Sequence, residues 1–234
     1  MRDWRSYRLL VEGPAGARAN MDRDEAILAA YRDGRVPPTW RIYDWTAPAA
    51  TYGHFAAPPA LPPGVEAARR LSGGGVVPHG ADITYCVVCE RRVGGENYED
   101  IVAAVALALA RLGVPAAVWR GGSRGQAGLC FASLAPYDVH VAGRKVAGCA
   151  QRRLRDAILH HGSIADDRPA PALVGAGLWD DAATTTIASA LGRPVGVQGF
   201  ARALAEVTGM QPLFGPPADD VGSTARQERQ AKTR

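Results

Sequence analysis

The chain has 234 residues, 47% of them apolar, and its 27 basic and 23 acidic side chains give a net charge of +4. This length and composition predict a globular protein with one large domain or two small ones. The weak positive charge does not indicate a nucleic-acid-binding protein, and no apolar run is long enough to predict a membrane span. The first residues lack the apolar segment of a signal peptide, so we expect a cytoplasmic protein with four reduced cysteines.

Apolar periodicity predicts more strands than helices in the first two-thirds of the chain. We expect strands at residues 7–11, 39–45, 76–88, 116–119 and 158–164, a short apolar stretch at 50–55, and a β-hairpin with arms at 137–141 and 145–149. We expect helices at residues 20–31, 98–112, 183–191 and 199–208. Because strands and helices do not alternate regularly, the prediction is a mixed α/β fold, with helices packed on a central mixed sheet.

The sequence also predicts a helix cap, a proline-rich loop and a domain boundary. Asn20 is the expected N-cap of the first helix, with acidic residues in its first turns, where the helix dipole favours them. Prolines predict a loop over residues 56–64. From Gly215 onward the sequence is polar and without periodicity. We therefore expect one catalytic-size domain over residues 1–215 and a disordered tail over 216–234.

Residues 69–75, Arg-Arg-Leu-Ser-Gly-Gly-Gly, form the most informative stretch of the chain. Glycine has no side chain, so a ligand can approach the backbone N–H groups of this loop closely. Arg69 and Arg70 add positive charge that suits a carboxylate or phosphate. A glycine motif alone is also compatible with a simple surface turn.

Two further stretches accompany this loop: residues 137–152, which contain Gly-Arg-Lys-Val-Ala-Gly-Cys-Ala-Gln, and residues 160–164, His-His-Gly-Ser-Ile. With the glycine loop and His79 they resemble the lipoate–protein ligase and octanoyltransferase superfamily, which includes the biotin–protein ligase catalytic domain. The stretches Asn20-Met21, Arg41-Ile42-Tyr43 and Tyr52-Gly53 look similar too. The resemblance covers about residues 5–215 and implies a biotin/lipoate protein ligase-like fold.

The resemblance also implies a site for an acyl chain. Lys145 is expected to contact the acyl carbonyl, although a solvated hairpin lysine is the ordinary alternative. His160 and His161 either help to deprotonate an attacking lysine or are structural. The expected substrate-binding residues are Arg70, Ser72, Gly73, Gly74, Gly75, His79, Gly148, Cys149, Ala150, His161 and Gly162, with Gly73, Gly74 and Gly75 along the acyl tunnel.

Cys130 lies fifteen residues before Lys145, as in the octanoyltransferase branch that uses a cysteine nucleophile. The resemblance therefore implies Cys130 and Lys145 as catalytic residues. A nearby cation from Arg144, Lys145 or His161 would favour the thiolate, whereas the alternative is a cysteine that only fills space. Cys86 and Cys89 have the spacing of a metal or redox pair but no second pair of ligands, so we expect core residues and no metal site.

The function that the resemblance implies is octanoyl transfer in lipoate biosynthesis. Acyl carrier protein or a lipoyl domain would donate the group to Cys130, and a lysine of a lipoyl domain (the glycine-cleavage H protein or an E2 subunit) would receive it, without a cofactor. The first alternative is a lipoate–protein ligase that needs ATP and Mg²⁺, against which the lack of an accessory domain after residue 215 argues. No nucleic acid or membrane is an expected partner.

The second alternative is a non-catalytic acyl-binding or scaffold homologue. Two departures from the family pattern favour it. The residue after His79 is Gly80, where the family often has an acidic residue, and the next acid is Asp82. After Cys130-Phe131 the chain continues with Ala132-Ser133 rather than Pro-Ser.

Overall fold

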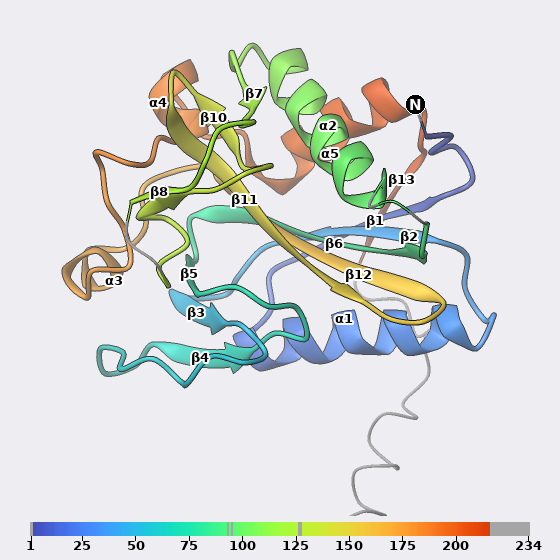
Figure 1. Ribbon diagram of the computed structural model, residues 1–234, viewed down its shortest axis with the longest axis horizontal. Helices are drawn as coiled ribbons and strands as arrows, with labels where there is room; N and C mark the ends of the chain where they lie inside the picture. Colours follow the sequence, from blue (N-terminus) through green and yellow to red (C-terminus); the bar gives the residue numbers. More distant parts are fainter. Residues whose placement is uncertain (1, 93, 95, 126–127, 216–234) are drawn as a thin grey trace, which may run out of the picture.

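The structure, a computed structural model, describes residues 2–92, 94, 96–125 and 128–215. Within these ranges a mixed eight-stranded sheet forms the centre of the fold (Figure 1). Strand β1 is parallel to β13 and β2, and the other neighbouring strands are antiparallel, so the predicted mixed sheet is confirmed. The order is β13 (Pro212–Gly215), β1 (Arg8–Glu12), β2 (Thr39–Tyr43), β6 (Asp82–Glu90), β12 (Ala157–Ala165), β11 (Arg144–Arg153), β10 (Val139–Val141) and β7 (Ala117–Val118).

Helices cover both faces of this sheet (Figure 1). Helices α2 (Glu96–Arg111) and α5 (Gly196–Thr208) pack on one face, over a core that includes Ile158. Helix α1 (Ala17–Arg32) packs on the other, over a core that includes Leu159. Successive residues of a strand point to opposite faces, and so β12 contributes to both cores. No helix within the described ranges combines the length and apolarity that crossing a membrane would require.

A three-stranded sheet lies beside α1, in the order β4 (Glu66–Arg69), β3 (Ala49–Tyr52) and β5 (Val76–His79). The glycine loop connects β4 to β5. The sequence did not predict β4, because its Glu-Ala-Ala-Arg sequence has no apolar alternation and it pairs only with β3, at the edge of the sheet. Short elements complete the fold: β8 (Arg124–Gly125), β9 (Ser133–Leu134), α3 (Pro171–Gly175) and α4 (Ile187–Leu191).

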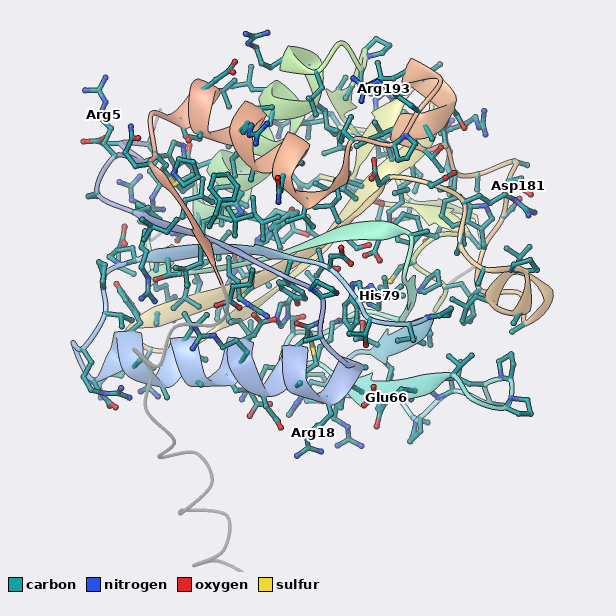
Figure 2. All side chains as sticks on the ribbon, turned by 180° about the vertical axis from the view of Figure 1, so that it is seen from behind. Arg5, Arg18, Glu66, His79, Asp181 and Arg193 are labelled. Carbon is teal, nitrogen blue, oxygen red and sulfur yellow. The ribbon has the colours of Figure 1, made fainter. Side chains whose placement is uncertain are left out.

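The first helix begins at Ala17, so the prediction of Asn20 as its N-cap is wrong. The carboxylate of Glu66 accepts hydrogen bonds from the backbone N–H groups of Ala17 (2.7 Å) and Arg18 (3.0 Å) and thereby caps the helix from β4 (Figure 2). A cap from a distant strand leaves no local sequence signal. Asn20 is buried instead, and its amide donates to the carbonyls of Ala15 and Asp44.

Two other elements differ from the prediction. The expected strand over residues 76–88 is split into β5 and β6 at Gly80, whose φ of +112° favours glycine. The expected helix over 183–191 begins only at Ile187, after its N-cap Thr186. The residues before it run beside Lys145, which exchanges backbone hydrogen bonds with Ala183 and Thr185. The predicted tail, residues 216–234, lies outside the described residues.

A buried ionic network joins β1, β2 and α1. Arg41 on β2 pairs with Glu12 on β1 and, at 2.8 Å, with Asp24 on α1. Its guanidinium also donates to the Asn20 amide oxygen at 2.8 Å. All four side chains are buried, so the charges are stable only while they remain paired.

Replacing Arg41 with methionine should destabilise the fold strongly. The variant leaves the buried carboxylate of Asp24 without its guanidinium partner, while Glu12 keeps its pair with Arg23. Breaking a buried ion pair in this way typically costs about 3–5 kcal/mol of the free energy of unfolding. Urea denaturation followed by circular dichroism measures the effect. The matched control is Arg32→Gln, which breaks an exposed pair with Asp156 and should leave the midpoint almost unchanged. Equal midpoints for the two variants would contradict this account of the network.

Candidate active site

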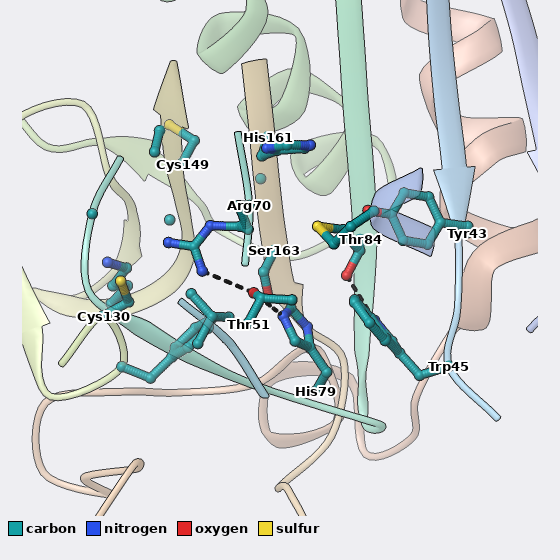
Figure 3. Close-up of a pocket in the computed structure, with 18 residues that line it drawn as sticks. Tyr43, Trp45, Thr51, Arg70, His79, Thr84, Cys130, Cys149, His161 and Ser163 are labelled. Carbon is teal, nitrogen blue, oxygen red and sulfur yellow. Dashed lines mark hydrogen bonds between the residues drawn. The ribbon is translucent and has the colours of Figure 1, made fainter. Parts of the chain in front are cut away.

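A cavity that is partly open to solvent lies where the small sheet meets β11 and β12 (Figure 3). Its lining is mostly apolar, with a few polar groups that converge on it, as is usual for small-molecule sites. The lining residues are Met21, Tyr43, Trp45, Thr51, Arg70, Gly74, Val77, His79, Thr84, Cys130, Phe131, Lys145, Gly148, Cys149, Ala150, His161, Gly162 and Ser163.

The cavity collects most of the residues that the sequence assigned to a site. Ser72, Gly73 and Gly75 differ, because they do not line it. The carbonyls of Gly73 and Gly75 accept hydrogen bonds from Arg70 at 3.1 and 2.9 Å, and Ser72 forms a hydrogen bond with His161, which lines the cavity. Of the three glycines expected along the acyl tunnel, only Gly74 borders the cavity.

Cys130 reaches the cavity because its segment is attached to the start of β5. The Val76 N–H donates to the carbonyl of Gly128 (3.0 Å), and the Cys130 N–H donates to the carbonyl of Val76 (3.1 Å). A Cβ on Gly75 would lie 2.0 Å from the Gly128 oxygen, so only glycine permits this approach. Gly75 thus brings Cys130 to the glycine loop and does not itself contact the cavity.

The four cysteines are free thiols with different surroundings. Cys86 and Cys89 are buried in the two cores, and burial raises the pKa of each thiol. Cys149 lines the cavity, but burial of its thiol raises its pKa to about 12, against an opposing hydrogen bond with Tyr98. Cys130 is half-buried and lines the same cavity.

Lys145 is buried and forms an ion pair with Asp138, at 2.9 Å. It is therefore not a solvated hairpin lysine. Asp138 also accepts a hydrogen bond from the Ala135 N–H (2.7 Å), and burial raises its pKa although Lys145 opposes the shift. A Cβ on Gly148 would lie 2.4 Å from Lys145 Cε, so this glycine makes room for the lysine. Sequence reasoning missed Asp138 because nothing in the chain marks the partner of a lysine across a hairpin.

His161 is held from both sides. Its Nε2 lies 3.2 Å from an oxygen of Asp24 and its Nδ1 lies 2.8 Å from Ser72 Oγ. Burial would raise the pKa of Asp24, but Arg41 and His161 outweigh it and hold that pKa below its usual value. The carboxylate therefore accepts from Nε2–H, and Nδ1 shares a hydrogen bond with the Ser72 hydroxyl.

Asp24, Cys86 and His161 also bring three potential metal-ligand atoms within 4.8 Å of one another. The donor set fits a metal poorly. Arg41 already neutralises Asp24, and burial raises the pKa of Cys86 well above its usual value, which keeps the thiol protonated. We describe the group as a hydrogen-bonded network that orients His161.

His79 belongs to a second network, on the other side of the cavity. Its Nδ1 lies 2.9 Å from Asp82, its Nε2 lies 2.7 Å from Thr51 Oγ1, and its ring stacks on Trp45. Burial would raise the pKa of Asp82, but His79 and the hydroxyls of Ser163 and Thr84 outweigh it and lower that pKa. Asp82 therefore contacts His79 in place of the acid that the family often has at position 80.

Several lining residues were not predicted as site residues. Met21 and Tyr43 lie in stretches that already resembled the family, so the sequence offered a signal for them. Thr51 directly precedes such a stretch. Phe131 and Ser163 also lie in stretches that resembled the family. Trp45, Val77 and Thr84 carry no signal of their own, because only the packing of separate strands brings them to the cavity.

Comparisons with known proteins agree with this geometry. The family model described as the lipoyl protein ligase A/B catalytic domain matches residues 16–208, and the chain belongs to this family. The octanoyltransferase LipM of Symbiobacterium thermophilum is 37% identical over 85% of this chain and 86% of that protein. That of Moorella thermoacetica is 34% identical over 68% of this chain and 64% of that protein. A structure of lipoate-protein ligase A bound with ATP superposes with a TM-score of 0.72, at 20% identity, over 95% of this chain and 93% of that one. The superfamily and the fold predicted from the motifs are confirmed.

His160 and His161 are neighbours on β12 but point to opposite faces of the sheet, and only His161 lines the cavity. Burial lowers the pKa of His160 to about 3. The folded state therefore keeps this ring neutral while the unfolded chain takes up a proton below about pH 6.5.

Stability should consequently fall as the pH drops below 6.5, until the folded ring also titrates. His160 contributes roughly 2 kcal/mol of this loss between pH 7 and pH 5, at 1.36 kcal/mol for each pH unit below 6.5. In His160→Phe, which keeps an aromatic ring against Tyr98, urea midpoints at the two pH values should differ less than in the wild type. An undiminished difference would show that His160 is not responsible.

Gly74→Val should abolish binding of octanoate to the cavity. A Cβ at Gly74 would lie 3.4 Å from Arg70 Nη2 and 3.8 Å from Ala150 Cβ, both at the cavity wall, so the branched side chain would occupy space meant for the ligand. Titration calorimetry with octanoate measures the loss. Gly64→Val is the control, because Gly64 also has a positive φ (+81°) but has no neighbour within 4 Å of its Cβ position. Normal octanoate binding by Gly74→Val would show that the glycine loop is a simple turn with no role in binding the ligand.

Proposed function

We propose that this protein transfers an octanoyl group from acyl carrier protein, or from a lipoyl domain, to a lysine of a lipoyl domain, through a thioester on Cys130. Octanoyl transfer is the activity for which the curated relatives are named, and the prediction of an octanoyltransferase is confirmed at that level. The covalent route, the acyl carrier protein and the particular lipoyl domains (the glycine-cleavage H protein and E2 subunits) are part of the proposal.

One observation carries the covalent route. Cys130 is a half-buried thiol on the wall of the largely apolar cavity, whereas burial raises the pKa of each of the other three thiols and keeps them protonated. The thiolate is the reactive form of cysteine, so Cys130 is the thiol that the cavity makes available as a nucleophile.

In the first step the Cys130 thiolate attacks the carbonyl carbon of the donor thioester. A new S–C bond forms, the bond from the acyl carbon to the donor sulfur breaks, and the donor thiolate leaves with the electron pair. Lys145 is buried beside the cavity and presents its ammonium group to the developing oxyanion, while Asp138 fixes its position. The apolar wall that includes Gly74 and Val77 accommodates the acyl chain.

In the second step the neutral amine of the acceptor lysine attacks the thioester carbon. The N–C bond forms, the bond to Cys130 Sγ breaks, and the cysteine leaves as a thiolate. The proton that the amine loses passes to solvent or to a base at the cavity. His161 offers no unoccupied nitrogen for this role, since Ser72 and Asp24 bind both, and we assign it to positioning.

This route needs no ATP, because the donor is already an activated thioester. A ligase would instead activate a free acid with ATP and Mg²⁺. The similarity to a ligase bound with ATP is at 20% identity and concerns the fold, so we treat ATP dependence as an outcome of the test. Against a non-catalytic scaffold, Asp82 contacts His79 although position 80 is a glycine. The other departure, Ala132-Ser133 after Cys130-Phe131, is unaffected by this contact.

Incubation with octanoyl-acyl carrier protein, without ATP, should add one octanoyl group to the protein, and hydroxylamine should remove it. Intact-mass spectrometry measures both. Cys130→Ser should show no hydroxylamine-labile adduct and should transfer far more slowly, because a serine hydroxyl is barely ionised without a dedicated base. Cys149→Ser, in the same cavity, should retain the adduct. Loading that requires ATP and Mg²⁺, or that persists in Cys130→Ser, would contradict the proposed transferase and favour a lipoate–protein ligase.

A further inference from the structure

Arg70 is a buried cation without a carboxylate partner. Only 6% of the residue is exposed, and none of the ion pairs among the described residues includes it. Its guanidinium donates to three neutral oxygens: Thr51 Oγ1 at 2.8 Å and the carbonyls of Gly73 and Gly75. A buried guanidinium usually pairs with an acid, because leaving water is costly for an unpaired charge.

Arg70 also lines the cavity together with Cys130 (Figure 3). The two residues are also joined through the backbone. Arg70 donates to the carbonyl of Gly75, and the carbonyl of the next residue, Val76, accepts a hydrogen bond from the Cys130 N–H. Arg70 is thus the cation held beside the segment that carries Cys130, and opposite charges at close range stabilise each other.

The other ionisable groups at the cavity already have partners. Lys145 pairs with Asp138, and the histidines are bonded to acids, His79 to Asp82 and His161 to Asp24. The thiol of Cys149 stays protonated because burial raises its pKa. Arg144, considered above as a source of charge, instead donates to the carbonyls of Asp181 and Thr184.

We infer that Arg70 is the counter-cation of the Cys130 thiolate, and that Asp82, His79 and Thr51 are positioning residues that hold it there. This inference rests on the proposed nucleophilic role of Cys130. In this interpretation Arg70 does not bind a carboxylate of the substrate but sets the reactivity of the Cys130 thiol. Neither Lys145 nor Arg144 supplies the cation that stabilises the thiolate.

The positioning residues form one hydrogen-bonded chain. Arg70 Nη1–H donates to Thr51 Oγ1, Thr51 Oγ1 shares a hydrogen bond with His79 Nε2, and His79 Nδ1–H donates to the Asp82 carboxylate. Asp82 is charged because its pKa is lowered. The buried Thr51 hydroxyl has a partner on each side, so the chain holds Arg70 in one place. The acid lies at the far end of the chain from the guanidinium.

Arg70 assists at two points in the transfer. It favours loss of the Cys130 proton to solvent before attack on the donor thioester, and it favours departure of the same sulfur as a thiolate when the lysine amine displaces it. The charge that appears on sulfur is the same in both steps, so one fixed cation serves both without moving.

The test is the pH dependence of alkylation of Cys130 by iodoacetamide, read from the mass of the Cys130 peptide. In Arg70→Met the pH of half-maximal rate should rise by about one unit or more, the usual effect of removing an opposite charge at close range. Thr51→Val keeps the shape of the side chain but removes the hydroxyl, and it should move the profile the same way by a smaller amount. Thr51→Ser should restore it.

The matched control is Arg144→Met, which removes a cation that donates to the carbonyls of Asp181 and Thr184 and should leave the alkylation profile in place. A wild-type profile in Arg70→Met and Thr51→Val would overturn the inference, as would a shift in the control as large as that in Arg70→Met. If Arg70→Met does not fold, the Thr51→Val and Thr51→Ser pair decides alone. Octanoyl loading of the wild-type protein is measured separately. An absence of loading would contradict the proposed function, whereas an unchanged alkylation profile would contradict only the role inferred for Arg70.

Discussion

The structure of the site depends on one guanidinium. Arg70 donates to the carbonyls on both sides of Gly74, and these bonds set the shape of the glycine loop. Its bond to Thr51 ties that loop to β3, and through His79 and Asp82 to β5 and β6. The end of the same loop, at Gly75, receives the segment that carries Cys130. One buried charge therefore joins the glycine loop, the segment that carries Cys130 and both sheets.

A second buried network performs the same task from the opposite face. Arg41 fixes Asp24, Asp24 binds His161, and His161 binds Ser72 of the glycine loop. Each network has an acid, a histidine and a hydroxyl, and each histidine lines the cavity with both nitrogens occupied. Burial makes such networks costly unless every member is satisfied. We interpret this arrangement as rigid support for the loop, which leaves the chemistry to Cys130 and Lys145.

The sequence predicted the fold class and most of the cavity because both have local or motif signals. The periodicity of residues 39–45 and 158–164 located strands, and three separate motifs located Gly74, Cys130 and Lys145. It failed where the cause is non-local. Glu66 caps α1 from a distant strand, and Asn20 is buried instead of capping. Asp138 and Thr51 acquire their partners only through strand pairing, so no spacing in the chain could reveal them.

The proposed acyl thioester on Cys130 would be visible in a crystal structure of the protein after reaction with an octanoyl thioester, without an acceptor domain. We expect electron density continuous with Cys130 Sγ, an acyl chain that passes Gly74 and Ala150, and a carbonyl oxygen directed toward Lys145. A free acid in the cavity with no bond to Cys130, or an adduct on another residue, would contradict this proposal.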